Sequence, residues 1–177
     1  AGVYTLTAVN IHGCVNSANI SVKVLPNPTL SVADATVCLY SPHVFSASGA
    51  QQYLWTGPDG FSAQVPTPTL ASAIYHGTTH YHVTGTAVNG CTASAGVALS
   101  TRNLPVPAIS VSPGAHVCER GSVSLEGHGG VLYSWKGPFQ LHFNGKKLDM
   151  TISHYAAAGD FTVKVFDVMG CGASTDT

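Results

Sequence analysis

The sequence predicts an all-β fold arranged as a tandem array of antiparallel β-sandwich repeats. One fourteen-residue phrase opens the chain (AGVYTLTAVNIHGC) and returns near its end (AGDFTVKVFDVMGC), with a looser copy at 76–91. LPNPTLSV returns as LPVPAISV after 79 residues, and Trp55 returns as Trp135 after 80. Self-similarity at one fixed period of about 80 residues is the signature of a repeat architecture.

Within each repeat, apolar residues alternate with polar or small ones, and Gly, Pro, Asn or Asp interrupt the pattern every eight to twelve residues. Such alternation is typical of antiparallel strands that bury one face. Residues 71–77 and 153–159 each admit a helical turn instead. The strands expected from the pattern are 4–9, 19–24, 43–48, 80–88, 122–127 and 161–166.

The repeat period divides the chain into three segments. The N-terminal segment, 1–25, is expected to hold the C-terminal strands of a truncated repeat. The middle segment, 26–103, is expected to be a complete repeat, and the C-terminal segment, 104–177, a repeat that lacks its last strand. The two proline-containing phrases LPNP and LPVP then serve as short, stiff linkers, because proline restricts the backbone and removes an amide donor.

Composition argues against nucleic acid binding and against a membrane-spanning segment. Only 8% of the residues are charged and the formal net charge is -1, so the chain has no basic field for nucleic acid. Its apolar runs are short, and none reaches the roughly 18 to 20 residues that a membrane span needs. We therefore expect no nucleic acid partner and no membrane span.

Five cysteines carry the strongest spacing signal. Cys38 and Cys91 are 53 residues apart, as are Cys118 and Cys171, so the spacing predicts one disulfide within each of these two repeats. Closing a loop of that size contributes roughly 4 kcal/mol in the loop-entropy model. Cys14 is left unpaired or bonded to a cysteine upstream. Disulfides indicate an oxidising compartment, and hence an extracellular or cell-surface protein.

The phrases VCLYSPHVFSASGAQQYLWTGPDGF with YHVTGTAVNGC, and HVCERGSVSLEGHGGVLYSWKGP with DFTVKVFDVMGC, resemble Ig-like and PKD-like β-sandwich repeats of secreted bacterial surface adhesins of the Bacteroidota type. The resemblance covers nearly the whole chain. It implies a stalk or adhesive repeat displayed outside the cell. Each first cysteine precedes strand B and each second follows strand F, so the bridge is expected near one end of the sandwich.

Aromatic residues at equivalent places in the repeats are expected in the core. Stacking of tyrosine and tryptophan rings on sugars is the alternative use of such residues. It would make the chain a carbohydrate-binding or accessory module of a secreted enzyme. The residues assigned to the core are Trp55, Trp135, Tyr4, Tyr81 and Phe161.

Other candidates for chemistry have weaker support. His76, His80 and His82 form the densest imidazole cluster and are weak candidates for a metal site, but no carboxylate nearby in the sequence would orient the rings. No nucleophile motif accompanies the Ser, His and Asp residues, so neither an enzyme nor a cofactor is expected. Lys146 and Lys147 follow an Asn-Gly pair and are expected at a hairpin tip.

These observations together predict a non-enzymatic extracellular structural or adhesive repeat, as part of a stalk or a surface filament. Its expected partners are adjacent repeats of the same parent chain, further copies in a filament, and a surface glycan or protein ligand. The carbohydrate-binding module remains the alternative.

Overall fold

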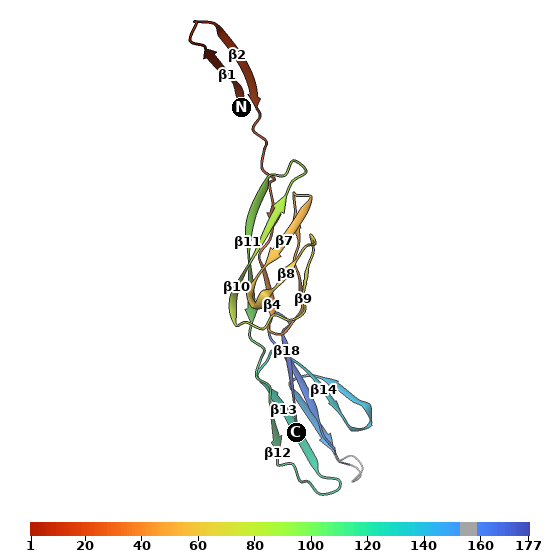
Figure 1. The fold of residues 1–177 in the computed structure, drawn as a ribbon. Coiled ribbons are helices and arrows are strands. Elements are labelled where there is room, and N and C mark those ends of the chain that lie inside the picture. The colour runs from red at the N-terminus through yellow and green to blue at the C-terminus, as the bar shows by residue number, and fades with distance from the viewer. Residues whose placement is uncertain (153–158) are drawn as a thin grey trace. The chain divides into compact units, whose positions relative to one another are not determined.

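The computed structural model describes residues 1–152 and 159–177 of the chain. Its described elements are β-strands, apart from two short 3-10 turns at Pro58–Gly60 and Pro138–Gln140 (Figure 1). Contacts between Cα atoms divide the chain into two compact units. The first unit comprises Ala1–Ala35, Val44–Leu70 and His80–Ala98, and the second comprises Thr36–His43, Ala71–Thr79 and Leu99–Thr177.

The first unit begins with a two-stranded antiparallel hairpin, β1 (Gly2–Val9) and β2 (Val15–Val22) (Figure 1). Tyr4, Leu6 and Ile20 share one face of it, because side chains alternate along a strand and Tyr4 lies opposite Ile20. Both strands are exposed along their whole length. A hairpin of two strands is marginally stable by itself in water, so this one is expected to need a covering partner.

Three aromatic rings form the core of the first unit. Trp55 comes from β7 (Gln52–Thr56) and Tyr81 from β10 (Gly77–Thr86), two strands that pair antiparallel. The ring centroid of Phe45 lies 5.3 Å from that of Trp55 and 4.7 Å from that of Tyr81. Aromatic pairs at these distances contribute packing energy beyond their buried area.

The remaining strands up to residue 102 complete one five-stranded sheet and two short ladders. The sheet has the order β4-β11-β10-β7-β8, and β4, β10 and β11 contribute residues to both units. The further strands are β3 (Ser31–Val32) paired with β6 (Ala47–Ser48), β5 (His43–Val44) paired with β9 (Thr69–Leu70), β4 (Ala35–Cys38), β8 (Ser62–Ala63) and β11 (Thr92–Arg102).

The second unit contains two sheets that face each other as a β-sandwich (Figure 1). One has the order β12-β13-β16 and the other β15-β14-β17-β18. Trp135 lies at the centre of the core between them, and its Nε1 atom donates a 2.9 Å hydrogen bond to the carbonyl oxygen of Gly145. The strands are β12 (Ala108–Ser112), β13 (Ser122–His128), β14 (Leu132–Gly137), β15 (Leu141–Asn144), β16 (Lys147–Thr151), β17 (Thr162–Phe166) and β18 (Gly172–Asp176).

Local backbone features recur at the 80-residue offset seen in the sequence. Gly49 and Gly129 have φ angles of 98° and 95°, and a Cβ atom at either would lie 1.9 Å from a backbone carbonyl oxygen. The hydroxyl groups of Tyr53 and Tyr133 each donate to the carbonyl oxygen three residues before them. The middle and C-terminal segments therefore share local structure as well as sequence.

Three sequence predictions about secondary structure are wrong. The C-terminal segment does have a last strand, because β18 contains no proline and pairs antiparallel with β17 along its whole length. Asn144 and Gly145 form no hairpin tip, since β15 pairs with β14 and β16 with β13, so the chain crosses between sheets there. Residues 71–77 form no helical turn, since 71–76 have bends and irregular backbone and 77 begins β10, and the turn considered at 153–159 falls on residues 153–158, outside the described residues.

Candidate functional site

A disulfide bond joins the middle and C-terminal segments. Cys38, the last residue of β4, is bonded to Cys171, which lies between β17 and β18, and both belong to the second unit. Their Cα atoms are 5.5 Å apart, although 133 residues separate them in sequence. The predicted pairs, Cys38 with Cys91 and Cys118 with Cys171, are therefore wrong, and Cys14, Cys91 and Cys118 are free thiols.

Strand direction explains why Cys118 cannot reach Cys171. Two residues after Cys118, the amide of Arg120 donates to the carbonyl of Ile152, at the end of the unit where β13 begins. Cys171 follows β17. The last residue of β17, Phe166, accepts a hydrogen bond from the amide of Val131, which lies three residues beyond the other end of β13. The seven residues of β13 span roughly 23 Å, whereas the Cα atoms of a disulfide lie within about 7 Å of each other.

The same reasoning separates Cys38 from Cys91. Cys91 directly precedes β11, and the other end of that strand is at Arg102, whose carbonyl accepts a 2.8 Å hydrogen bond from the amide of Leu39. The eleven residues of β11 give a separation of roughly 35 Å along the strand. The signal that could have revealed this is strand order. Strands B and F of a sandwich, which are β13 and β17 in the second unit, run in the same direction, so a cysteine before B and one after F lie at opposite ends.

The turn that carries Cys171 is held by Asp167. Its Oδ1 atom accepts hydrogen bonds from the amides of Met169 and Cys171, at 2.8 Å and 2.9 Å. Its Oδ2 atom lies 3.9 Å from the Nε atom of Arg102, the last residue of β11. Since both side chains are partly exposed, this ion pair adds little stability, and the disulfide is the stronger link at the site.

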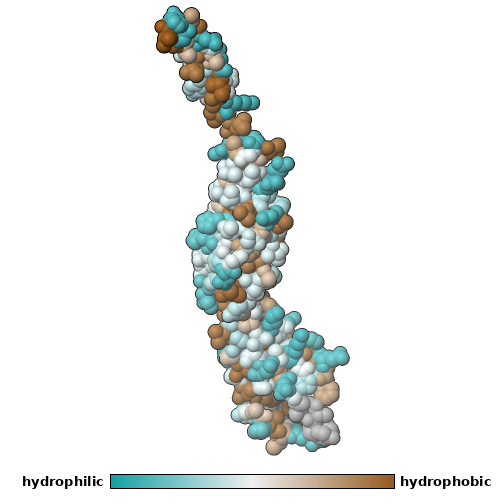
Figure 2. Space-filling view, in the orientation of Figure 1, coloured by the Kyte–Doolittle hydropathy of each residue, from teal (hydrophilic) through white to brown (hydrophobic). Residues whose placement is uncertain are grey.

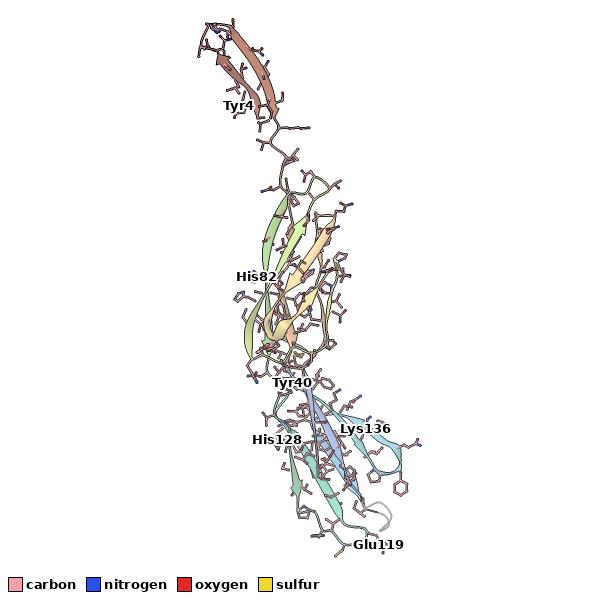
Figure 3. All side chains as sticks on the ribbon, in the orientation of Figure 1. Tyr4, Tyr40, His82, Glu119, His128 and Lys136 are labelled. Atoms are coloured by element: carbon pink, nitrogen blue, oxygen red, sulfur yellow. A yellow bond between two sulfur atoms is a disulfide. The ribbon has the colours of Figure 1, made fainter. Side chains whose placement is uncertain are left out.

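The turn that carries Cys38 is also well ordered by hydrogen bonds. The amide of Ser41 donates to the carbonyl of Cys38 at 3.0 Å, and the amide of Tyr40 donates to the carbonyl of Ala73 at 2.8 Å. Leu39 and Ala73 are buried beside it. In Figure 3, the labels place Tyr40 and Glu119 at opposite ends of the second unit, as expected for the neighbours of Cys38 and Cys118.

The predicted core aromatics have different environments. Trp55 and Trp135 are fully buried, Tyr81 is buried, and Phe161 packs half-buried against the core of the second unit. Tyr4 is 62% exposed on the N-terminal hairpin, where Figure 3 labels it. Its assignment to the core is wrong for this structure, because no second sheet covers the hairpin within the part of the chain that the structure describes.

The three candidate metal-binding histidines do not converge. His80 and His82 are exposed on β10, where they alternate with buried Tyr81 and Val83, and His82 projects outward in Figure 3. The Nδ1 atom of His76 lies 2.7 Å from the Oδ1 atom of Asn103. In residues 1–152 and 159–177, no three His, Cys, Asp or Glu side chains are grouped so that they could hold a metal ion.

The strand order defines an all-β chain whose antiparallel sheets form an Ig-like β-sandwich fold. Its described residues include no helix long and apolar enough to cross a bilayer. No protein-family model matches the sequence, and no curated protein matches it either. Solved structures that resemble the chain include the eight N-terminal Ig domains of Down Syndrome Cell Adhesion Molecule, at 13% identity and a TM-score of 0.49, covering 99% of this chain and 34% of that one.

Two bacterial structures are also similar. One is a Ca²⁺-stabilized adhesin with which an Antarctic bacterium binds ice, at 11% identity and a TM-score of 0.46, covering 98% of this chain and 54% of that one. The other consists of the fibronectin(III)-like modules of Clostridium thermocellum CbhA, at 9% identity and a TM-score of 0.41, covering 84% and 91% of the two chains.

Proposed function

We propose that this chain is a non-enzymatic, extracellular structural repeat protein, whose two Ig-like repeats (26–103 and 104–177) and N-terminal strands of a truncated repeat (1–25) form part of a stalk or surface filament. The observation that carries the proposal is the bond between Cys38 and Cys171. A covalent link between consecutive segments lets tension pass from one to the next without unfolding the residues between. It also fits an oxidising location outside the cell, where disulfides persist.

The sequence resemblance to PKD-like repeats of Bacteroidota-type adhesins supports the same function. On this proposal, adjacent repeats of the parent chain are the first partners, and a surface protein or glycan is the ligand of the assembled adhesin. The alternative, a carbohydrate-binding module, needs exposed aromatic rings for stacking on sugars. Trp55 and Trp135 are fully buried, so neither is available for that role.

The N-terminal hairpin carries an apolar face that a partner would cover. Apolar side chains are exposed on both strands of the N-terminal hairpin, and Figure 2 shows hydrophobic surface along it. Tyr4 and Leu6 are 62% and 73% exposed on the same hairpin face. Exposed apolar area of this kind marks an interaction surface, and either an adjacent repeat of the parent chain or a second copy of the chain could cover it.

Force spectroscopy tests the structural role. When the oxidised chain is pulled from its two ends, the 133-residue stretch closed by the disulfide should not extend. Reduction should then add about 45 nm of contour length, at roughly 3.3–3.6 Å per residue. The variant Cys38→Ser should extend fully in oxidising buffer, and Cys91→Ser should behave as the unmodified chain.

A glycan array on the same oxidised protein tests the alternative. No glycan binding, together with the shortened extension, supports the structural role. Equal extension of the oxidised and reduced chains would overturn the structural role, and saturable binding of a defined glycan by such a chain would favour the carbohydrate-binding module.

A further inference from the structure

The free thiol of Cys91 is presented by the same kind of turn as bonded Cys171. In both turns the residue four positions earlier, Ala87 or Asp167, donates its amide to the carbonyl of the cysteine at 2.9 Å. In both, the glycine before the cysteine donates back to that same residue, at 2.9 Å and 3.1 Å. Cys14 lies in a third copy of this turn, closed by Asn10.

The free thiol of Cys118 is likewise presented as bonded Cys38 is. In each case the residue three positions later donates its amide to the carbonyl of the cysteine, at 3.0 Å for Cys38 and 2.8 Å for Cys118. The second residue after the cysteine has a positive φ in both turns, 65° at Tyr40 and 66° at Arg120. The five cysteines therefore fall into two structural classes, one before strand B and one after strand F.

The two classes lie at opposite ends of a repeat, as the second unit shows. Val117, Phe161 and Thr177 line one cavity, so Cys118 lies at the end of the unit where β18 ends. Cys171 lies at the other end, where β12 begins with Ala108 opposite the last residue of β13. The first residues of a repeat therefore lie beside its second cysteine, and its last residues lie beside its first cysteine.

Cys91 occupies the entry position of the middle segment. Its Sγ atom lies 3.9 Å from the carbonyl oxygen of Leu25, and the Nδ2 atom of Asn89 in the same turn donates to the carbonyl of Pro26 at 3.0 Å. Leu25 and Pro26 belong to the linker that leads into the middle segment. At the junction between the middle and C-terminal segments the first cysteine of one repeat meets the second cysteine of the next, and Cys91 holds the second-cysteine position beside the preceding linker.

We infer that the bond between Cys38 and Cys171 belongs to a series of disulfides, each of which joins the first cysteine of one repeat to the second cysteine of the following repeat. In this series Cys118 forms a disulfide with the cysteine in the Gly-Cys turn of a following repeat. Cys91 forms a disulfide with the first cysteine of a preceding repeat. Cys14 belongs to the same class as Cys91. The inference rests on the proposed function and deepens it, because it names adjacent repeats as covalent partners.

Each such bond needs an oxidant of the disulfide class, either an oxidised dithiol oxidoreductase or a small-molecule disulfide. One thiolate attacks the disulfide of the oxidant and forms a mixed disulfide, releasing one thiol of the oxidant. The thiolate of the neighbouring repeat then attacks the mixed disulfide and releases the second thiol. The two repeat thiols lose two protons and two electrons in total, and the oxidant gains them.

An extended chain tests the inference directly. Residues 98–177 are appended in frame after Thr177, which continues the 80-residue period and adds one following repeat to the intact chain. The appended copy carries Val106→Ile at an exposed position, so that its Cys118 peptide differs in mass from the original one. The protein is oxidised with a glutathione redox buffer, digested with trypsin without reduction and mapped by mass spectrometry. We expect the original Cys118 bonded to Cys171 of the appended copy, while Cys38 stays bonded to the original Cys171. A thiol reagent should label Cys118 in the 177-residue chain, but it should not label the original Cys118 in the oxidised extended chain.

A matched variant and a second measurement complete the test. Cys118→Ser in the extended chain should leave the appended Cys171 free and the original bond unchanged. In the 177-residue chain, Cys38→Ser should leave Cys171 as a free thiol that forms no disulfide with Cys118. A bond between Cys118 and Cys171 of one copy, or a free Cys118 in the oxidised extended chain, would overturn the inference. Force extension and glycan binding of the 177-residue chain do not depend on Cys118, so failure of the proposed function would be recognised separately.

Discussion

Cys38 is covalently bonded to Cys171, although the two residues belong to consecutive segments of the chain and are 133 residues apart. The bond closes a large loop that contains most of the middle segment and nearly all of the C-terminal segment. Because loop-closure entropy grows with loop length, such a bond restricts the unfolded chain strongly. The stabilities of the two segments are therefore linked through one pair of sulfur atoms.

Replacing Cys38 with serine should lower the free energy of unfolding by about 2–4 kcal/mol, because the unfolded chain regains the freedom that the bond removes. Urea denaturation of the oxidised proteins measures the difference. The matched control is Cys91→Ser, which removes a free thiol and should change stability by less than about 0.5 kcal/mol. Equal losses in the two variants would show that the bond does not contribute in this way.

The two core tryptophans should respond differently to phenylalanine. The indole nitrogen of Trp135 donates to the carbonyl of Gly145, whereas that of Trp55 is buried without a partner among the described residues. Trp135→Phe leaves a carbonyl unpaired, while Trp55→Phe removes an unpaired donor. We expect the first substitution to cost about 1–2 kcal/mol more than the second, as measured by calorimetry. A larger cost at Trp55 would contradict the assigned hydrogen bonding.

Two glycines at the 80-residue offset should be hard to replace. An alanine at Gly49 or Gly129 would place its Cβ atom 1.9 Å from the carbonyl oxygen of Thr29 or Val106, in addition to adopting a positive φ. Gly170 also has a positive φ, but a Cβ atom there would have no neighbour within 4 Å. Gly170→Ala should cost roughly 1–2 kcal/mol for its backbone conformation alone. Chemical denaturation should show clearly larger losses at Gly49 and Gly129, and similar losses at all three would be inconsistent with the close approach.

Much of the fold follows from local pattern, whereas the site depends on strand direction. Alternation predicts the strand at 161–166, and the 80-residue spacing relates Trp55 to Trp135, because burial of one sheet face imposes a period of two on each repeat. The partner of Cys38 cannot be found from spacing, since equal intervals of 53 residues arise from repetition alone. Placing Cys38 and Cys91 at opposite ends requires the directions of the strands between them.

The pKa of Glu126 offers a test of surface electrostatics. The hydrogen bond from Lys146, at 2.8 Å, and the charge of that ammonium group lower the pKa of the Glu126 carboxyl group below its usual value. A lowered pKa in the folded state means that the pair stabilises the fold above the usual pKa of glutamate. This contribution is lost as pH falls through the lowered value.

Lys146→Met should therefore raise the pKa of Glu126 toward its usual value, as followed by NMR titration of its side-chain carboxyl carbon. Lys23→Met, in the linker after the N-terminal hairpin, should leave the Glu126 titration unchanged. An unchanged pKa in Lys146→Met would show that the ion pair is not maintained in solution.

The N-terminal hairpin should drive self-association through the face that carries Tyr4, Leu6 and Ile20. Leu6 shares a face with Tyr4 and Ile20, while Thr5 points to the opposite face of the same strand. Leu6→Asp places a charge within the apolar face and should weaken concentration-dependent association by at least about tenfold, since removal of a buried leucine costs roughly 1.5–3 kcal/mol. Thr5→Asp adds the same charge on the other face and should leave association nearly unchanged. Sedimentation equilibrium of the oxidised proteins distinguishes the two variants, and a monomeric parent chain at all concentrations would exclude this face as a filament contact.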